Sequence, residues 1–172
     1  MTADTLAATV GAAAAAELLA ALDRIKHCVG QLSDEQIWWR EQPALNSIGN
    51  LMLHLAGNVR QWLVSGLSGA RDVRHRPAEF AERGPIPKDE LLGRLTATVT
   101  EAVGILRGLS SQQLTETRRV QGRNITGLQV IFNSVPHFRG HTQEIIHLTR
   151  VQLGDAYQMA WTPTTPEQGA PS

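Results

Sequence analysis

Two histidines four residues apart, His137 and His141, are the residues of this chain whose type and spacing point most directly to chemistry. On a helix, side chains at that spacing project from one face with Cβ atoms about 6 Å apart, so both imidazoles can bind one metal ion. His54, on a different predicted helix, is the candidate for a third ligand. Three neutral imidazoles would leave a divalent ion with its full charge and an open coordination position, which is typical of catalytic metal sites.

A simpler interpretation of His137 and His141 stays open, in which both are ordinary helix histidines with hydrogen-bond partners. The chain has six histidines in 172 residues, and chance often supplies such a pair. The apolar neighbours Val135 and Phe138 favour the metal site, because they would exclude water and a buried imidazole without a partner is costly.

His54 by itself also has a simpler interpretation as a hydrogen-bonded polar residue. It lies, however, in a polar stripe with Asn50 and Asn58 one turn away on either side, and these amides could orient its ring or face a ligand. Three other side chains are candidates for the surroundings of the site: Asn133, Gln143 and Trp38.

A di-iron carboxylate centre is the rival metal site, since Glu144 and His147 form a Glu-x-x-His motif. That cofactor needs two such motifs and two further glutamates from other helices. The helix predicted at residues 46–67 contains no Asp or Glu, so the ligand count excludes the di-iron centre. Glu144 then stays as a candidate general base, as a support for His141, or as plain surface charge.

Four long helices must position these residues. Hydrophobic periodicity predicts them at about residues 6–29, 46–67, 88–108 and 126–153. Capping-box patterns at Ser33 and Ser110 predict two short helices between them, and a third pattern begins the last long helix at Thr126. The fold class is therefore an all-α four-helix bundle with long crossover connections and short extra helices.

Two features depart from the regular pattern of the predicted bundle. Residues 68–87 are rich in proline and charge and are typical of a long connection or lid. Pro136 lies inside the last helix, where it either kinks that helix or divides it in two. No segment of the chain indicates a strand.

Length and composition indicate one domain over residues 1–161, followed by a flexible tail at 162–172. Sixteen basic and sixteen acidic residues cancel, and no Lys/Arg stripe indicates a nucleic-acid or anionic-membrane partner. The single Cys28 excludes a disulfide framework and fits a reducing, cytoplasmic location. The Ala-rich segment 6–22 lacks the features of an export signal, and no membrane span is expected.

In the order and spacing of these residues, the chain resembles the DinB/YfiT-type superfamily of metal-binding four-helix bundles. The resemblance rests on His54 within residues 51–58 (LMLHLAGN) and on His137-x-x-x-His141 followed by residues 142–145 (TQEI). It covers about Leu18 to Leu153, and Pro136 and the 68–87 segment depart from it.

The resemblance implies a divalent metal, zinc or nickel, held by the three histidines, with water or substrate in the remaining positions. Relatives include transferases and isomerases that use a low-molecular-weight thiol such as bacillithiol or mycothiol, and dimers are common among them. We therefore expect a homodimeric, metal-dependent S-transferase or hydrolase that acts on a small molecule. The alternatives are a non-catalytic metal- or ligand-binding dimer associated with stress, and a metal-free helical scaffold.

Overall fold

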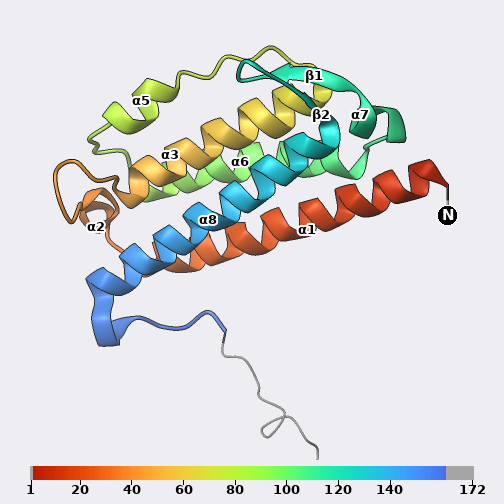
Figure 1. Cartoon of the computed structure of the whole chain (residues 1–172). Helices are drawn as coiled ribbons and strands as arrows, with labels where there is room; N and C mark the ends of the chain where they lie inside the picture. Colours follow the sequence, from red (N-terminus) through yellow and green to blue (C-terminus); the bar gives the residue numbers. More distant parts are fainter. Residues whose placement is uncertain (1, 162–172) are drawn as a thin grey trace, which may run out of the picture.

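Four long helices make up most of the computed structural model, which describes residues 2–161 (Figure 1). They are α1 (Ala3–Gly30), α3 (Ile48–Val59), α6 (Lys88–Arg107) and α8 (Gly127–Leu153). Short helices lie in the connections: α2 (Asp34–Trp38), α5 (Arg76–Ala81) and α7 (Ser111–Thr115). The predicted all-α four-helix bundle is confirmed, while the predicted tail at 162–172 lies outside the described residues.

Side-chain caps define where several of these helices begin. Reciprocal capping boxes are formed at Ser33, Ser110 and Thr126, as predicted, and a further one is formed at Ser47. Each hydroxyl accepts a hydrogen bond from the third helical N–H, which has no partner within the helix. The cap at Ser47 places the start of α3, and thereby the turn of α3 on which His54 lies.

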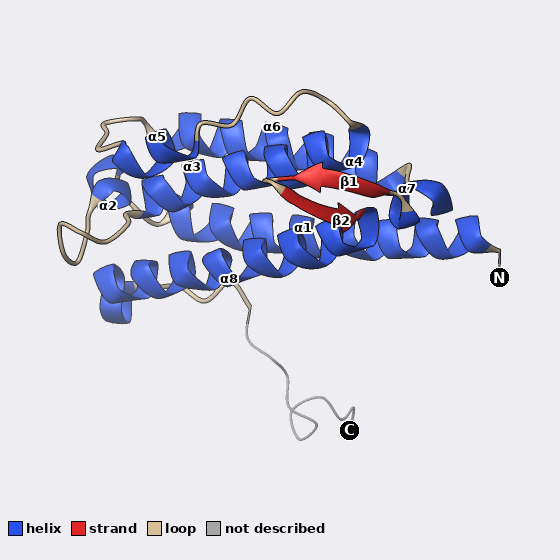
Figure 2. Cartoon of the chain, turned by 45° about the horizontal axis from the view of Figure 1, so that its top comes forward, coloured by secondary structure: helices blue, strands red, loops and turns tan. Residues whose placement is uncertain are grey.

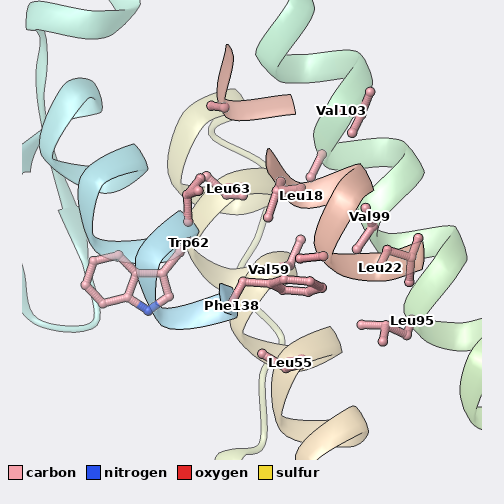
Figure 3. Close-up of a cluster of buried hydrophobic side chains, with 14 of the residues drawn as sticks. Leu18, Leu22, Leu55, Val59, Trp62, Leu63, Leu95, Val99, Val103 and Phe138 are labelled. Carbon is pink, nitrogen blue, oxygen red and sulfur yellow. The ribbon is translucent and has the colours of Figure 1, made fainter. Parts of the chain in front are cut away.

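The hydrophobic core lies along the axis of the bundle. α1 packs against α6 and α8, and α3 packs against the same two helices from the other side. Phe138 of α8 is fully buried and projects toward Val59 of α3 and Leu22 of α1 at the centre of the cluster (Figure 3). Aliphatic side chains at helical spacing supply most of the rest, as the low aromatic content predicts.

The order of the helices explains the length of the 68–87 segment. α3 and α6 run in the same direction through the bundle, so the chain must return along the whole molecule between them (Figure 1). The helical path from Ile48 to Ser68 contains 21 residues and is about 30 Å long. A loop of two to six residues cannot span that distance. The returning chain crosses the outer side of α3 and forms α5 there, in contact with α3.

The second long helix is less regular than its periodicity predicts. After α3 the chain forms a π-helix over Arg60–Ser65, and then a short α-helix, α4, at Gly66–Ser68. The N–H of Gly66 donates to the carbonyl of Gln61, five residues earlier, which is the wider π pattern. The helical path still reaches the predicted end near residue 67.

The expectation that the chain has no strand is wrong. β1 (Thr117–Val120) and β2 (Arg123–Thr126) form an antiparallel hairpin between α7 and α8 (Figure 2). Its two-residue turn has positive φ at Gln121 and Gly122, the combination that tight hairpins require. The strands are four residues long and rich in arginine, so they lack the apolar alternation by which strands are recognised.

Pro136 does not divide the last helix, because α8 is continuous from Gly127 to Leu153. Pro136 removes the hydrogen bond to the carbonyl of Phe132, and both residues are exposed. Water can therefore solvate that carbonyl. The histidines that follow Pro136 stay on one uninterrupted helix.

α1 is long and apolar enough to span a membrane by length and composition, with a mean hydropathy of 1.7 over its best window. A core helix passes the same test. In this bundle the side of α1 that carries Leu18, Leu22 and Ile25 is buried against the other helices.

Candidate metal centre

His54, His137 and His141 meet at one point between α3 and α8. Each offers a ring nitrogen, and these atoms lie within 4.8 Å of one another. Nε2 of His54 is 2.9 Å from Nε2 of His137. The rings stand nearly perpendicular to one another, with centroids 4.5 to 5.1 Å apart.

The core determines which way these side chains face. Phe138 points into the centre of the bundle, and this fixes the rotation of α8. His137 and His141 then lie on the neighbouring side of α8, which faces α3. On α3, Leu51 and Leu55 occupy the core and His54 lies beside them, 4% exposed. Packing therefore brings together histidines that are 83 residues apart in the sequence.

The far nitrogen of His54 is held by a carboxylate. Nδ1 of His54 lies 3.0 Å from Oε2 of Glu79, which comes from α5. A carboxylate only accepts hydrogen bonds, so an N–H at Nδ1 of His54 donates a hydrogen bond to Glu79. Nη2 of Arg74 also lies 3.1 Å from Nδ1, but it donates to the same carboxylate oxygen at 2.7 Å. Nε2 of His54 is then unprotonated and presents its lone pair to the cluster.

Glu79 is itself fixed by Arg74. The guanidinium donates through Nε to Oε1 and through Nη2 to Oε2, both at 2.7 Å, and Nη1 donates to Gln61 at 2.9 Å. Burial raises the pKa of Glu79, but the hydrogen bonds and charges of Arg74 and His54 outweigh it and lower that pKa overall. Glu79 is therefore ionised at neutral pH, with Arg74 balancing its charge.

Two residues of α3 make room for α5 and hold it. Gly57 has no side chain where Oε1 of Glu79 lies, and a Cβ there would be 2.0 Å from that oxygen. Asn50 is fully buried, and its Nδ2 donates to the backbone carbonyls of Glu79 at 2.8 Å and Glu82 at 3.0 Å. α3 thus binds the segment that carries the carboxylate for its own histidine.

His141 has a carboxylate partner of the same kind. Its Nδ1 lies 2.7 Å from Oε2 of Glu144, one turn further along α8. This hydrogen bond lowers the pKa of Glu144 below its usual value. The proton of His141 therefore stays on Nδ1, and Nε2 is free to bind a ligand.

His137 is kept neutral by its surroundings. Burial, followed by the nearby charges of His141, His54, Arg74 and Arg76, lowers the pKa of His137 to about 4. At neutral pH its ring is unprotonated on one nitrogen. Each of the three imidazoles therefore has one ring nitrogen placed to bind a common ion.

A pocket of about 410 Å³ opens onto the three histidines. Its remaining lining consists of two cations, one aromatic ring and three amides, and among the described residues no carboxylate lines it: Arg74, Arg76, Phe80, Asn46, Asn58 and Gln121. Phe80 packs against the ring of His54, with centroids 4.9 Å apart. The pocket is therefore polar, positively charged and covered on one side by an aromatic residue.

Of the residues predicted to surround the site, only Asn58 lines this pocket, where its Oδ1 accepts a hydrogen bond from Ser134 at 3.4 Å. Asn50 does not line the pocket, and its side chain donates to backbone carbonyls of α5 and of Glu82, which follows it. The ring of His54 is oriented by Glu79, and not by either asparagine.

The other three lie elsewhere. Trp38 packs beside Gly49 and Gly84 and donates to the carbonyl of Ile86 at 3.0 Å. Asn133 donates a hydrogen bond to the carbonyl of Gln129 within α8 and accepts one from Arg123 of the hairpin. Gln143 is exposed and lies in a groove with residues of α1.

The site residues that come from the connections between the long helices were not predicted from the sequence. Glu79, Arg74, Arg76 and Phe80 belong to the 68–87 segment, and Gln121 belongs to the unexpected hairpin. No local pattern in the sequence marks them. Only the return of the chain across α3 brings them to the histidines.

The donor set fits a mononuclear divalent metal. Two nitrogens that bind one ion at about 2.1 Å each stand about 3 Å apart, close to the separation of the Nε2 atoms of His54 and His137. Metal-binding histidines also donate their other N–H to a carboxylate or carbonyl, as His54 and His141 do here.

Comparison with known families supports a common origin for most of the chain. The model of a family described as "Protein of unknown function (DUF1572)" matches residues 11–165. No curated protein matches the sequence.

Two solved structures share the fold. A conserved protein from Enterococcus faecalis superposes with a TM-score of 0.69 at 18% identity, covering 82% of this chain and 95% of that one. A DinB-like protein from Bacillus cereus superposes with a TM-score of 0.60 at 15% identity, covering 77% of this chain and 85% of that one. The DinB-like character predicted from the histidine motifs is confirmed at the level of the fold.

Proposed function

Because this chain belongs to the DUF1572 family and has the fold of DinB-like proteins, we propose that it is a divalent-metal-dependent enzyme acting on a small molecule. The ligands are His54, His137 and His141, and the metal is zinc or nickel. The reaction class is S-transfer from a low-molecular-weight thiol, with hydrolysis as the second candidate.

One observation carries the proposal: one ring nitrogen from each of three histidines lies within 4.8 Å of the others, beside an open pocket. Structural zinc sites are closed by four protein ligands, whereas catalytic sites keep three and leave a position for water or substrate. Among the described residues, the cluster offers three donors and faces a pocket of about 410 Å³. This arrangement is the open kind.

A divalent ion held there would supply Lewis acidity, lowering the pKa of a water or thiol bound to it. The lining of the pocket favours the thiol. No carboxylate among the described residues lines the pocket, so no general base is positioned to take a proton from water. A thiol needs less help, since its ordinary pKa is about 8.5.

The protein's own residues hold and orient the ligands. Glu79 and Glu144 accept the Nδ1 protons of His54 and His141, which fixes the tautomers and aims both Nε2 atoms at one point. Phe80 covers one face of His54 and keeps water from it. Asn58 and Gln121 offer uncharged hydrogen-bonding groups to a substrate.

The sulphur nucleophile does not come from the protein. Cys28 is the one cysteine of the chain, and it is 1% exposed within α1. Its neighbours include Tyr157, and it does not line the histidine pocket. A thiol reaction at this site therefore requires a thiol cosubstrate.

The first test is metal stoichiometry. Purified protein loaded with zinc or nickel should contain about one equivalent after gel filtration, measured by elemental analysis. His54→Ala, His137→Ala and His141→Ala should each lower this value. His147→Ala is the matched control, since His147 is exposed on the same helix as two of the ligands. Absence of metal from the wild type, or equal losses in the control, would contradict the site.

The second test separates an enzyme from a binding protein. Displacement of chloride from 1-chloro-2,4-dinitrobenzene by a small thiol, which forms a thioether and releases chloride and a proton, should be faster with metal-loaded protein than with chelator-treated protein. If the protein binds a full equivalent of metal but the rate is the same with and without it, the non-catalytic, stress-associated dimer is favoured instead. Ester hydrolysis under the same conditions tests the second reaction class.

The cellular setting is part of the same proposal. A cytoplasmic location fits a chain whose one cysteine is a free thiol. A homodimer is the assembly we propose, by analogy with DinB-like proteins. Light scattering of the purified protein tests the assembly.

A further inference from the structure

Arg76 is the charged residue of the histidine pocket that no other part of the described chain neutralises. Its guanidinium makes no ion pair or hydrogen bond to another described residue. Arg74, by contrast, has a side chain only 2% exposed and already donates to Glu79 and Gln61. Of the two cations in the lining, Arg76 is therefore the one available to a ligand.

The position of Arg76 is set by aromatic packing. Its guanidinium carbon lies 4.7 Å from the centre of the Phe80 ring, and Phe80 in turn packs against His54. Stacking on an aromatic ring holds a guanidinium in place without using its N–H donors. Arg76 can thus present its donors to the pocket while Phe80 fixes it beside the metal ligands.

The charge of the whole pocket has one sign. The described lining holds no carboxylate, Glu79 is balanced by Arg74, and a divalent ion would add positive charge. A pocket of this kind attracts anions and discriminates against cations.

We propose that Arg76 is a specificity-determining residue that binds an oxyanion group, a carboxylate or a phosphate, of the thiol or substrate whose reacting atom lies at the histidine cluster. The planar guanidinium matches such a group with two parallel N–H donors. This inference rests on the proposed metal site, and it adds the chemical class of molecule that the site accepts.

The experiment compares thiols that differ only in the group at the end opposite the sulphur. Cobalt-loaded protein is titrated with 3-mercaptopropionate, with 2-mercaptoethylphosphonate and with the neutral 2-mercaptoethanol, and the thiolate-to-cobalt absorption band reports binding. We expect the charged thiols to bind about tenfold tighter than the neutral one, the size of a charge-assisted hydrogen bond. The carboxylate and phosphonate arms identify the preferred oxyanion.

Arg76→Gln should reduce the ratio of the affinities for the charged and the neutral thiols to near one, and this ratio cancels the effect of the lost charge on the metal-bound thiolate that all three ligands share. Arg76→Lys should retain part of the preference, because a lysine keeps the charge but not the planar pair of donors. Arg71→Gln is the matched control, since Arg71 lies on the same connection but does not line the pocket. It should behave as the wild type.

The outcomes separate this inference from the function on which it rests. If cobalt binds and 2-mercaptoethanol produces the band, but the charged thiols bind no tighter, the inference is overturned and the metal site stands. A preference that survives in Arg76→Gln would also overturn it, because the metal charge alone would then explain the selectivity. If no cobalt binds, the proposed function fails, and this inference fails with it.

Discussion

The carboxylate of Glu79 lies 3.0 Å from Nδ1 of His54, although 25 residues separate them in the sequence. This hydrogen bond joins the returning connection to the helix that it crosses. It gives the 68–87 segment a structural role at the histidine cluster, since the segment supplies the carboxylate that orients the ring of His54.

Glu79→Gln should lower the affinity for zinc by about 10- to 100-fold, the usual effect of losing a carboxylate behind a metal-binding histidine. A neutral amide no longer fixes the proton on Nδ1 of His54, and Arg74 is left without its counter-charge. Competition with a chromogenic chelator measures the affinity. Glu101→Gln is the control, because the carboxylate of Glu101 on α6 is exposed and pairs with Arg60. An equal loss of affinity in both variants would remove Glu79 from this role.

Gly57→Ala should have the same effect without any change of charge. The added Cβ would lie 2.0 Å from Oε1 of Glu79, so the carboxylate and α5 must move away from His54. Gly93→Ala on α6 is the matched control, because a Cβ there meets nothing within 4 Å. The control should be neutral or stabilising by up to about 1 kcal/mol. Metal affinity and thermal denaturation of both variants test the contrast, and an undiminished affinity in Gly57→Ala would contradict it.

Asn50→Ala should release the connection from α3. The amide of Asn50 donates to two carbonyls of the segment and accepts from Ser47 and Arg40, all while fully buried. Its loss should lower the free energy of unfolding by about 1–3 kcal/mol, because buried groups are left without partners. Trypsin should then cleave at arginines of the 68–87 segment before it cleaves elsewhere, as read by mass spectrometry. Cleavage sites identical to those of wild type would argue against this function of Asn50.

Cys28 should react slowly with thiol reagents in the native protein. Burial raises the pKa of Cys28 and outweighs the opposing hydrogen bonds from Thr149 and Tyr157. The thiolate is the reactive form, and its fraction rises with pH, so the native rate should stay low at pH 8 and increase only at higher pH. The rate with 5,5′-dithiobis(2-nitrobenzoate) should be at least about tenfold lower than in denaturant. A native rate equal to the denatured one would contradict the burial of Cys28 and the raised pKa that follows from it.

Much of the bundle can be predicted from local sequence signals. The four long helices follow from apolar spacing, and the starts of three helices follow from capping boxes at Ser33, Ser110 and Thr126. These signals act over three or four residues, so the sequence displays them directly. The hairpin at Thr117–Thr126 was missed because its strands are too short and too polar to show alternation.

The three histidines can be identified from the sequence alone, since their types, their order and the i, i+4 spacing on α8 already define a possible donor set. The residues that surround them depend on how the helices pack. Glu79 and Arg76 reach the site because α3 and α6 are parallel, which forces the connection back across α3. Such contacts depend on the packing of whole helices, and no local pattern of residues encodes them.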